Sequence, residues 1–256
     1  MTLPDDHELS GRLAGEAGDL LLALRERGGD PAALRADGDR QSHEFLASEL
    51  ARLRPGDAVL SEEGKDDRVR LSADRVWIVD PLDGTREFGE AGRTDWAVHV
   101  ALWQGGDLVA GAVALPAQGR KVLSTAVPPA RPQPPGSGQP LRLLVSRSRP
   151  PEFVQLMADK LGAELVPLGS AGAKAAAVIC GEAEGYVHAG GQYEWDSAAP
   201  VAVARAAGLH ASRIDGSKLA YNQASPSLPD ILICQAEIAP LLLETIGSVL
   251  PGGTPG

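Results

Sequence analysis

A run of six residues, Asp80-Pro81-Leu82-Asp83-Gly84-Thr85, constrains this chain more than any other feature. It directly follows Val76–Val79, a short apolar run that is typical of a buried strand. Mg²⁺ prefers oxygen ligands, so two carboxylates three residues apart, with the Leu82 carbonyl between them, are suited to hold adjacent ions. Pro81 stiffens this array, and Gly84 lets backbone N–H groups approach an anion closely. The run therefore predicts a metal site, although an ordinary turn that closes a strand fits it as well.

Two further acidic segments lie elsewhere in the sequence. Glu62 and Glu63 follow the apolar run Ala58–Leu60, which predicts a short strand that ends at these carboxylates. Asp196 lies in Trp195-Asp196-Ser197-Ala198-Ala199-Pro200, a pattern that indicates the start of a helix. Taken alone, Asp196 is explained equally well as a helix N-cap. Together with the first run, the three segments indicate one acidic cluster.

Composition and charge exclude several classes of function. The chain has 256 residues, 43% of them hydrophobic, which is enough for one large domain or two smaller ones. A formal net charge of −10 argues against binding to nucleic acid, so a phosphorylated ligand needs local positive charge, which divalent cations in the acidic cluster supply. No apolar run approaches the roughly 20 residues of a membrane span. The first residues do not resemble a signal peptide either, and a cytoplasmic location is expected.

Hydrophobic periodicity predicts an α+β part over residues 1–127. Apolar residues at helical spacing indicate a helix over 9–24, and a second helix is expected to begin near Asp39 and to run to about Leu53. Strands are expected at 58–60, 76–79, 96–102, 108–115 and 121–124, the last three in one sheet. Six prolines in 128–140 indicate an exposed connector and a domain boundary.

The second part, residues 141–256, is predicted to be α/β because strands and helices alternate there. Strands at 141–145, near Leu165 and at 186–187 alternate with helices at 151–161 and 171–181, and a further helix is expected to open at Asp196. The tail, 251–256, is expected to be disordered. Cys180 and Cys234 are predicted to be buried side chains without a disulfide. The five histidines show no zinc spacing and are interpreted as structural or surface residues, with His188 left open.

The order Ser61-Glu62-Glu63, then DPLDGT, then WDSAAP resembles the three metal-binding motifs of the inositol monophosphatase-like superfamily. The resemblance extends over nearly the whole chain and implies a layered αβαβα sandwich of the type also found in fructose-1,6-bisphosphatase. It implies two to three Mg²⁺ ions, with Li⁺ as an inhibitor. In that scheme Glu62, Asp80 and the Leu82 carbonyl bind the first ion. Asp80, Asp83 and Asp196 bind the second, and Glu62 contacts a looser third.

The same resemblance implies a phosphomonoester hydrolase in which a metal-bound water attacks the phosphorus directly. Thr85 and Glu62 would position that water. The backbone N–H groups of Gly84 and Thr85 would bind the phosphate, next to Asp83 and Asp196.

Asp39 matches an aspartate that supports the catalytic threonine in the family. The match is imperfect, because Ala36 stands where the family often has threonine. Asp37 lies nearby, so the choice between Asp37 and Asp39 stays open, as does the interpretation of both as solvated charges.

Three segments favour the branch of 3′(2′),5′-bisphosphate nucleotidases, the CysQ-type enzymes. Residues 83–88, DGTREF, resemble the continuation of the metal motif in that branch. Ser170 and Lys174 in GSAGAK match positions near the nucleotide and are candidates for binding a second phosphate. The segment 145–149 is similar to a serine- and basic-rich strand end, although a solvated loop explains it equally well. Inositol enzymes carry a glutamate seven residues before the motif aspartate, whereas this chain has Ala189.

The expected reaction is therefore removal of the 3′-phosphate of 3′-phosphoadenosine 5′-phosphate, which gives AMP and phosphate. Two alternatives stay open: a broad phosphatase of inositol phosphates and fructose 1,6-bisphosphate, and a non-catalytic metal or nucleotide sensor. The partner is expected to be a small phosphate ester, with no nucleic acid. Because members of the family often dimerise, a homodimer is a further expectation that the sequence does not decide.

Overall fold

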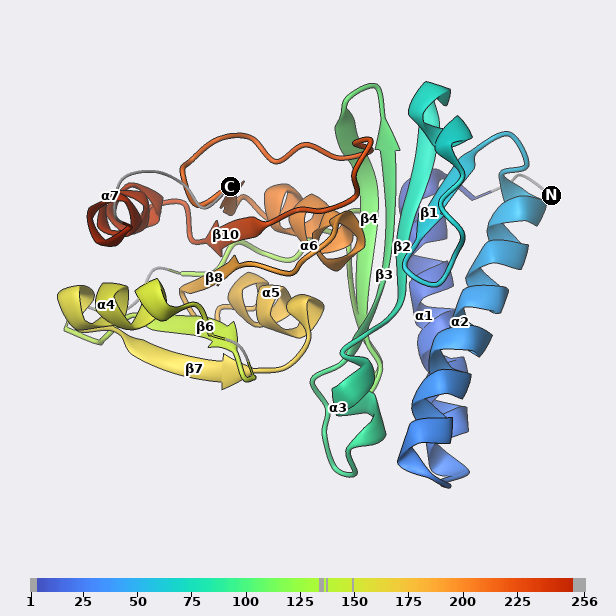
Figure 1. Ribbon diagram of the computed structural model, residues 1–256, viewed down its shortest axis with the longest axis horizontal. Helices are drawn as coiled ribbons and strands as arrows, with labels where there is room; N and C mark the ends of the chain where they lie inside the picture. The colour runs from blue at the N-terminus through green and yellow to red at the C-terminus, as the bar shows by residue number, and fades with distance from the viewer. Residues whose placement is uncertain (1–3, 134–135, 137, 149, 251–256) are drawn as a thin grey trace.

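The computed structural model describes residues 4–133, 136, 138–148 and 150–250. Its fold has five layers: a helix pair, a sheet, a second helix pair, a second sheet and a third helix pair (Figure 1). Three clusters of buried apolar side chains fill the spaces between successive layers. The expected layered α/β sandwich is therefore confirmed.

The first layer consists of α1 (Asp6–Glu26) and α2 (Pro31–Leu53). Asp30 caps α2, because its side chain accepts hydrogen bonds from the N–H groups of Ala32 and Ala33, each at 3.0 Å. Pro31 occupies the start of the helix, where its fixed φ is favourable and no N–H is needed. The prediction that this helix begins near Asp39 is wrong, since the helix begins at Pro31, eight residues earlier.

The first sheet has the strand order β1-β2-β3-β4-β5, with β1 and β2 parallel and the other neighbours antiparallel. Side chains alternate along the second strand, so Trp77 and Val79 pack against the first helix pair. Val76 and Ile78 face the space between the two sheets. Both faces of this strand are therefore buried, as its apolar sequence predicts. The elements of this half are β1 (Ala58–Ser61), η1 (Arg68–Ser72), β2 (Arg75–Asp83), α3 (Thr85–Gly89), β3 (Ala97–Gln104), β4 (Asp107–Leu115) and β5 (Lys121–Ser124).

The second sheet has the order β7-β6-β8-β10-β9 and mixes parallel and antiparallel pairs. Helices α5 and α6 lie between the two sheets, and α4 and α7 cover the outer face (Figure 1). The elements after α6 have no counterpart among the predicted ones. The bounds are β6 (Arg142–Ser146), α4 (Glu152–Leu161), β7 (Glu164–Leu168), α5 (Ala171–Ile179), β8 (Gly185–Ala189), α6 (Glu194–Ala206), β9 (His210–Ser212), β10 (Asp230–Cys234) and α7 (Ala239–Val249).

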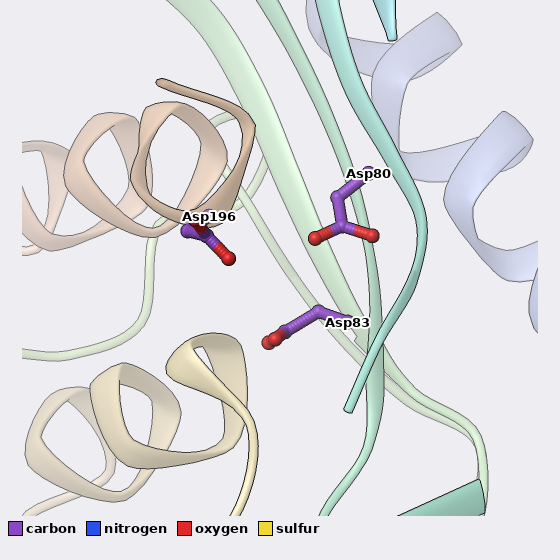
Figure 2. Close-up of side chains that lie close together, drawn as sticks. All are labelled: Asp80, Asp83 and Asp196. Carbon is purple, nitrogen blue, oxygen red and sulfur yellow. The ribbon is translucent and has the colours of Figure 1, made fainter. Parts of the chain in front are cut away.

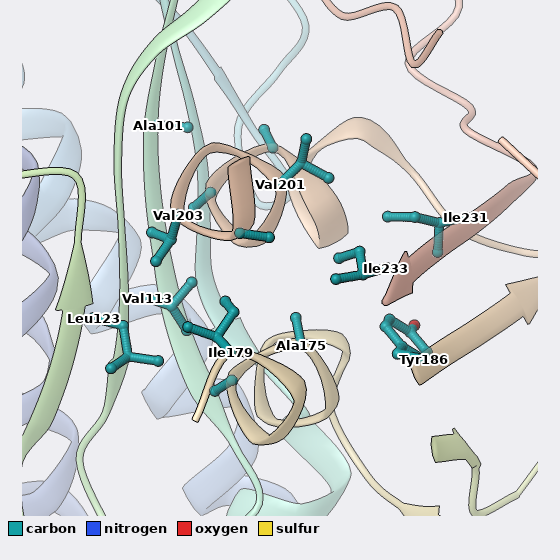
Figure 3. Close-up of a cluster of buried hydrophobic side chains, with 14 of the residues drawn as sticks. Ala101, Val113, Leu123, Ala175, Ile179, Tyr186, Val201, Val203, Ile231 and Ile233 are labelled. Carbon is teal, nitrogen blue, oxygen red and sulfur yellow. The ribbon is translucent and has the colours of Figure 1, made fainter. Parts of the chain in front are cut away.

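The cluster between the two sheets joins the two halves of the chain (Figure 3). Val113 of the first sheet belongs to the same cluster as Ile179 of α5, Val203 of α6 and Ile233 of β10. The described residues of 128–140 form no helix or strand and connect the sheets. The division into two domains at this connector stays a prediction.

The two cysteines differ in their exposure to solvent. Cys234 is buried in β10, but Cys180 is exposed just after α5, so the prediction of two buried cysteines is wrong. An alanine-rich context does not bury Cys180, because the helix ends there. The tail, 251–256, lies outside the described residues. Within the part of the chain that the structure describes, no helix is long and apolar enough to cross a membrane.

Ile233 tests whether the shared cluster stabilises the whole fold. Its side chain is fully buried, at 0% exposure, so Ile233→Ala removes packed atoms and leaves a cavity. We expect the free energy of unfolding, measured by urea denaturation, to fall by about 2–5 kcal/mol. Leu156→Ala, at a residue of α4 that is 55% exposed, should change it by less than about 0.5 kcal/mol. Equal, small changes for the two variants would contradict a core shared by both sheets.

Candidate active site

A bulge at the end of β2 brings Asp80 and Asp83 to the same face of the first sheet. Asp80 lies opposite His99 in β3 and Asp83 lies opposite Ala97, so three steps along β2 match two along β3. Because side chains alternate along a strand, the extra residue turns both aspartates toward the interior between the sheets. Leu82 points the other way, into the cluster beneath the first helix pair.

The third aspartate reaches the same place from α6. The expectation that this helix opens at Asp196 is wrong: it begins at Glu194, and Asp196 is its third residue. From there its Oδ2 accepts a hydrogen bond of 2.6 Å from the N–H of Tyr193, which fixes the carboxylate at the helix start. Carboxylate oxygens of Asp80, Asp83 and Asp196 lie within 4.8 Å of one another and point toward a common space (Figure 2).

Burial, and after it the crowding of negative charge, raises the pKa of several carboxyls in this region. Burial raises the pKa of Asp80 well above its ordinary value, and the charges of Glu62 and Asp83 add to the effect. Burial and the charge of Asp83 raise the pKa of Asp196 to about 6. Such a group holds its charge poorly without a counter-ion, and a divalent cation reverses that balance. The donor set, composed of carboxylate oxygens, fits a hard cation such as Mg²⁺.

Glu62 borders the three aspartates from the end of β1. The residue is exposed and does not belong to the group of three aspartates whose oxygens lie within 4.8 Å of one another. The pKa of Glu62 is raised to about 7. Loss of hydration is the largest cause, and the negative charges of Asp196 and Asp83 add to it. The raised pKa shows that the charge of Glu62 is influenced by the acidic cluster. Glu63 is exposed next to Glu62.

Asp83 differs from its neighbours because donors surround its carboxylate. Burial opposes its charge, but His99, the hydroxyl of Ser170 and the N–H of Gly172 hold the pKa of Asp83 at about 2. The Gly172 N–H donates at 2.6 Å and that of Ala171 at 3.1 Å, while Ser170 donates a further hydrogen bond. Asp83 is thus an ionised carboxylate fixed at the start of α5.

Of the two aspartates considered as partners of Thr85, Asp39 lies next to it in the structure. Thr85 Oγ1 lies 3.1 Å from Asp39 Oδ1 and 3.0 Å from the Leu82 carbonyl oxygen, and its single proton is donated to one of them at a time. Burial raises the pKa of Asp39 to about 6. Asp37 instead pairs with Arg40 at 2.8 Å on the exposed face of α2. The structure therefore places Asp39, and not Asp37, next to Thr85, and the role of Asp39 in catalysis stays a prediction.

Gly84 turns the chain between the metal motif and α3. Its φ of +84° lies in the left-handed region, which glycine adopts without strain. A Cβ at this position would lie 3.1 Å from the Ser170 side chain and 3.2 Å from the Asp95 carbonyl oxygen. No larger residue fits there without displacing α5 or β3. Whether the N–H groups of Gly84 and Thr85 bind phosphate stays a prediction.

A cavity of about 550 Å³ opens beside the acidic cluster. Ser170 lines it, but its hydroxyl is already bonded to Asp83. Lys174 also lines it, and its buried ammonium group donates to the carbonyl oxygens of Ser170 at 2.5 Å and Gly169 at 3.3 Å. Direct contact of these two side chains with a second phosphate stays a prediction.

Arg147 is the cation of the predicted basic strand end that reaches this cavity. Its guanidinium pairs with Glu87 at 2.7 Å and with Glu90 at 3.1 Å. His188 and Gln192 line the same cavity, and Ala189 follows His188 at the end of β8. Arg149 lies outside the described residues.

His99 is the site residue that sequence reasoning missed. It is interpreted above as structural or surface, yet it is fully buried and lies 3.3 Å from Asp83. The available signal was a polar residue inside the apolar run 96–102, which needs a buried partner. Naming that partner requires the register between β2 and β3, which the sequence does not show.

Comparison with known proteins identifies the family to which this fold and this acidic cluster belong. A family profile described as the inositol monophosphatase family matches residues 13–249, and the chain belongs to this family. Among curated relatives, it is 54% identical to a 3′-phosphoadenosine 5′-phosphate phosphatase of Mycobacterium leprae, over 95% of this chain and 94% of the relative. It is 30% identical to the 3′(2′),5′-bisphosphate nucleotidase CysQ of Escherichia coli K12, over 82% and 91%.

Solved structures show the same architecture. CysQ from Bacteroides thetaiotaomicron is similar with a TM-score of 0.74 and 28% identity, over 89% of this chain and 96% of that one. Inositol monophosphatase II from Staphylococcus aureus is similar with a TM-score of 0.77 and 22% identity, over 94% and 93%. The second likeness concerns the fold alone.

Asp83→Asn tests the role of this carboxylate. The variant removes one negative charge from the cluster, so we expect Mg²⁺ affinity, measured by calorimetry, to fall at least about tenfold. The fold should persist, because relief of repulsion offsets the weakened hydrogen bonds at α5. Asp159→Asn, on the exposed face of α4, is the matched control and should bind Mg²⁺ as the wild type does. Unchanged affinity in a folded Asp83→Asn variant would exclude Asp83 as a ligand.

Proposed function

We propose that this protein is a Mg²⁺-dependent phosphatase that converts 3′-phosphoadenosine 5′-phosphate to AMP and phosphate. The observation that carries the proposal is the convergence of Asp80, Asp83 and Asp196 beside a cavity large enough for a nucleotide. Identities of 52–54% to curated phosphatases of this substrate support the choice within the family.

The residues of the cluster would hold two or three Mg²⁺ ions. Glu62, Asp80 and the Leu82 carbonyl are proposed for one ion, and Asp80, Asp83 and Asp196 for another. When bound, Mg²⁺ lowers the pKa of water and neutralises charge on the phosphate oxygens. This local positive charge explains how a chain with a net charge of −10 accepts an anionic substrate.

Thr85 and Asp39 are proposed to orient the attacking water. The Thr85 hydroxyl has one proton, so donating it to Asp39 leaves its oxygen lone pairs free to accept a hydrogen bond from water. Asp39 thereby sets the direction in which Thr85 accepts. The chain needs no covalent nucleophile in this scheme, since Asp80 and Asp83 serve better as ligands.

The cavity supports a nucleotide rather than an inositol ring. Ala189 has no carboxylate to bind ring hydroxyls, and the cations Arg147 and Lys174 line the cavity, where they would attract a second phosphate. Ser170 and Lys174 remain the candidates for that second phosphate, together with Arg147. The retained pair of Thr85 and Asp39 argues against a non-catalytic sensor, which has no need to position a water.

Phosphate release from three substrates tests the proposed specificity. With Mg²⁺ present, kcat/KM for 3′-phosphoadenosine 5′-phosphate should exceed that for inositol 1-phosphate and fructose 1,6-bisphosphate by about tenfold or more, a difference of roughly 1.4 kcal/mol. EDTA should abolish all release. Equal rates on the three substrates would indicate a broad phosphatase, and no release from any would favour the sensor.

Thr85→Ala separates catalysis from binding. If Thr85 orients water, kcat should fall by about 10²-fold or more while KM changes little. Thr85→Ser keeps the hydroxyl and should recover most of kcat. A rise in KM with unchanged kcat in Thr85→Ala would assign the residue to substrate binding instead.

A further inference from the structure

His99 lies between two of the proposed ligand segments and contacts both. Its Nδ1 lies 3.0 Å from the carbonyl oxygen of Trp195, the residue before Asp196. Its Nε2 lies 3.3 Å from Oδ2 of Asp83. The side chain is fully buried at 0% exposure, and His99 is the third residue of β3. One ring therefore links the end of β2 to the start of α6.

The chemistry of the two contacts defines how the ring is held. A carbonyl oxygen only accepts, so Nδ1 carries a proton and donates it to Trp195. Nε2 lies against the Asp83 carboxylate, but the two groups are not aligned as a hydrogen bond. The ring therefore contacts one proposed ligand, Asp83, and the backbone of the residue before another, Asp196.

Helix α5 packs directly against the ring at Gly172. A Cβ at Gly172 would lie 2.0 Å from His99 Nε2, which is much too close for two non-bonded atoms. The same glycine donates its N–H to Asp83 at 2.6 Å. Only a residue without a side chain lets α5 approach both the histidine and the aspartate this closely.

We infer that His99 is a positioning residue, which sets the separation between Asp83 and Asp196 by linking Asp83 to the backbone of Trp195. The inference rests on the proposed function, because it assigns both aspartates to one Mg²⁺ ion. The two ligands come from different layers of the fold, β2 and α6, and His99 is a direct side-chain link between them. Residues that orient metal ligands in this way typically contribute about 10–100-fold to metal affinity.

Two variants of His99 should weaken metal binding to different degrees. His99→Leu loses both contacts, so its Kd for Mg²⁺, measured by calorimetry without substrate, should rise by about 10–100-fold. His99→Asn is shorter and reaches at most one partner, so a smaller rise is expected. His210→Asn, in β9 of the second sheet, is the matched control and should leave Kd unchanged.

Gly172→Ala displaces the ring without changing His99 itself. Alanine is the better helix former, yet its Cβ collides with Nε2, so Mg²⁺ affinity should fall here too. Gly247→Ala in α7 meets no atom within 4 Å and serves as the control. In steady-state assays His99→Leu and Gly172→Ala should need more Mg²⁺ for half-maximal kcat, and excess Mg²⁺ should restore part of the rate. A residue that only stabilises the fold does not produce this dependence.

The outcomes separate this inference from the proposed function. Wild-type protein that binds no Mg²⁺ would contradict the proposed function itself. Wild-type protein that binds Mg²⁺, with a folded His99→Leu variant of equal affinity, would overturn the role of His99 alone. If these variants do not fold, NMR of the wild-type protein tests the inference. A slowly exchanging His99 Nδ1–H whose chemical shift changes when Mg²⁺ is added supports it. A chemical shift that Mg²⁺ does not change overturns it.

Discussion

Repulsion among the carboxylates of one small region is the constraint on which the rest of this structure depends. Asp80, Asp83 and Asp196 come from two layers of the fold, and different local interactions fix their positions. A bulge turns the end of β2, the start of α5 surrounds Asp83 with donors, and a backbone N–H fixes Asp196. The folded chain thus stabilises an arrangement that water alone would not favour. Such an arrangement is explained by a cation that the carboxylates bind together.

The layered fold allows these segments to meet. The bulge turns both aspartates of β2 toward the interior, where α5 and α6 lie between the sheets (Figures 1 and 2). The apolar cluster around Val113, Ile179 and Ile233 fixes the distance between the layers. The geometry of the proposed metal site therefore depends on a hydrophobic core that contains none of the proposed ligands.

Much of the site is readable from the sequence because its signals are local. A strand followed directly by DPLDGT places two carboxylates and a glycine turn within six residues, and the fold class follows from the alternation of apolar runs. The sequence analysis does not predict that α2 begins at Pro31 or that α6 begins at Glu194. Proline and aspartate are common both at helix ends and near them, so neither residue fixes the first residue of a helix. His99 and the choice of Asp39 over Asp37 depend on register and on helix rotation relative to β2, which are set by tertiary packing. The exposure of Cys180 is decided in the same way, by where α5 ends.

The most direct test of the metal centre is a crystal structure with Mn²⁺ in place of Mg²⁺, because anomalous scattering locates that ion independently of the protein atoms. The account predicts at least two anomalous peaks, one shared by Glu62, Asp80 and the Leu82 carbonyl, and one shared by Asp80, Asp83 and Asp196. Asp83 should keep its hydrogen bonds to α5 while it binds the ion. A structure at millimolar Mn²⁺ with no peak among these carboxylates, or with ions bound only elsewhere, would contradict the account.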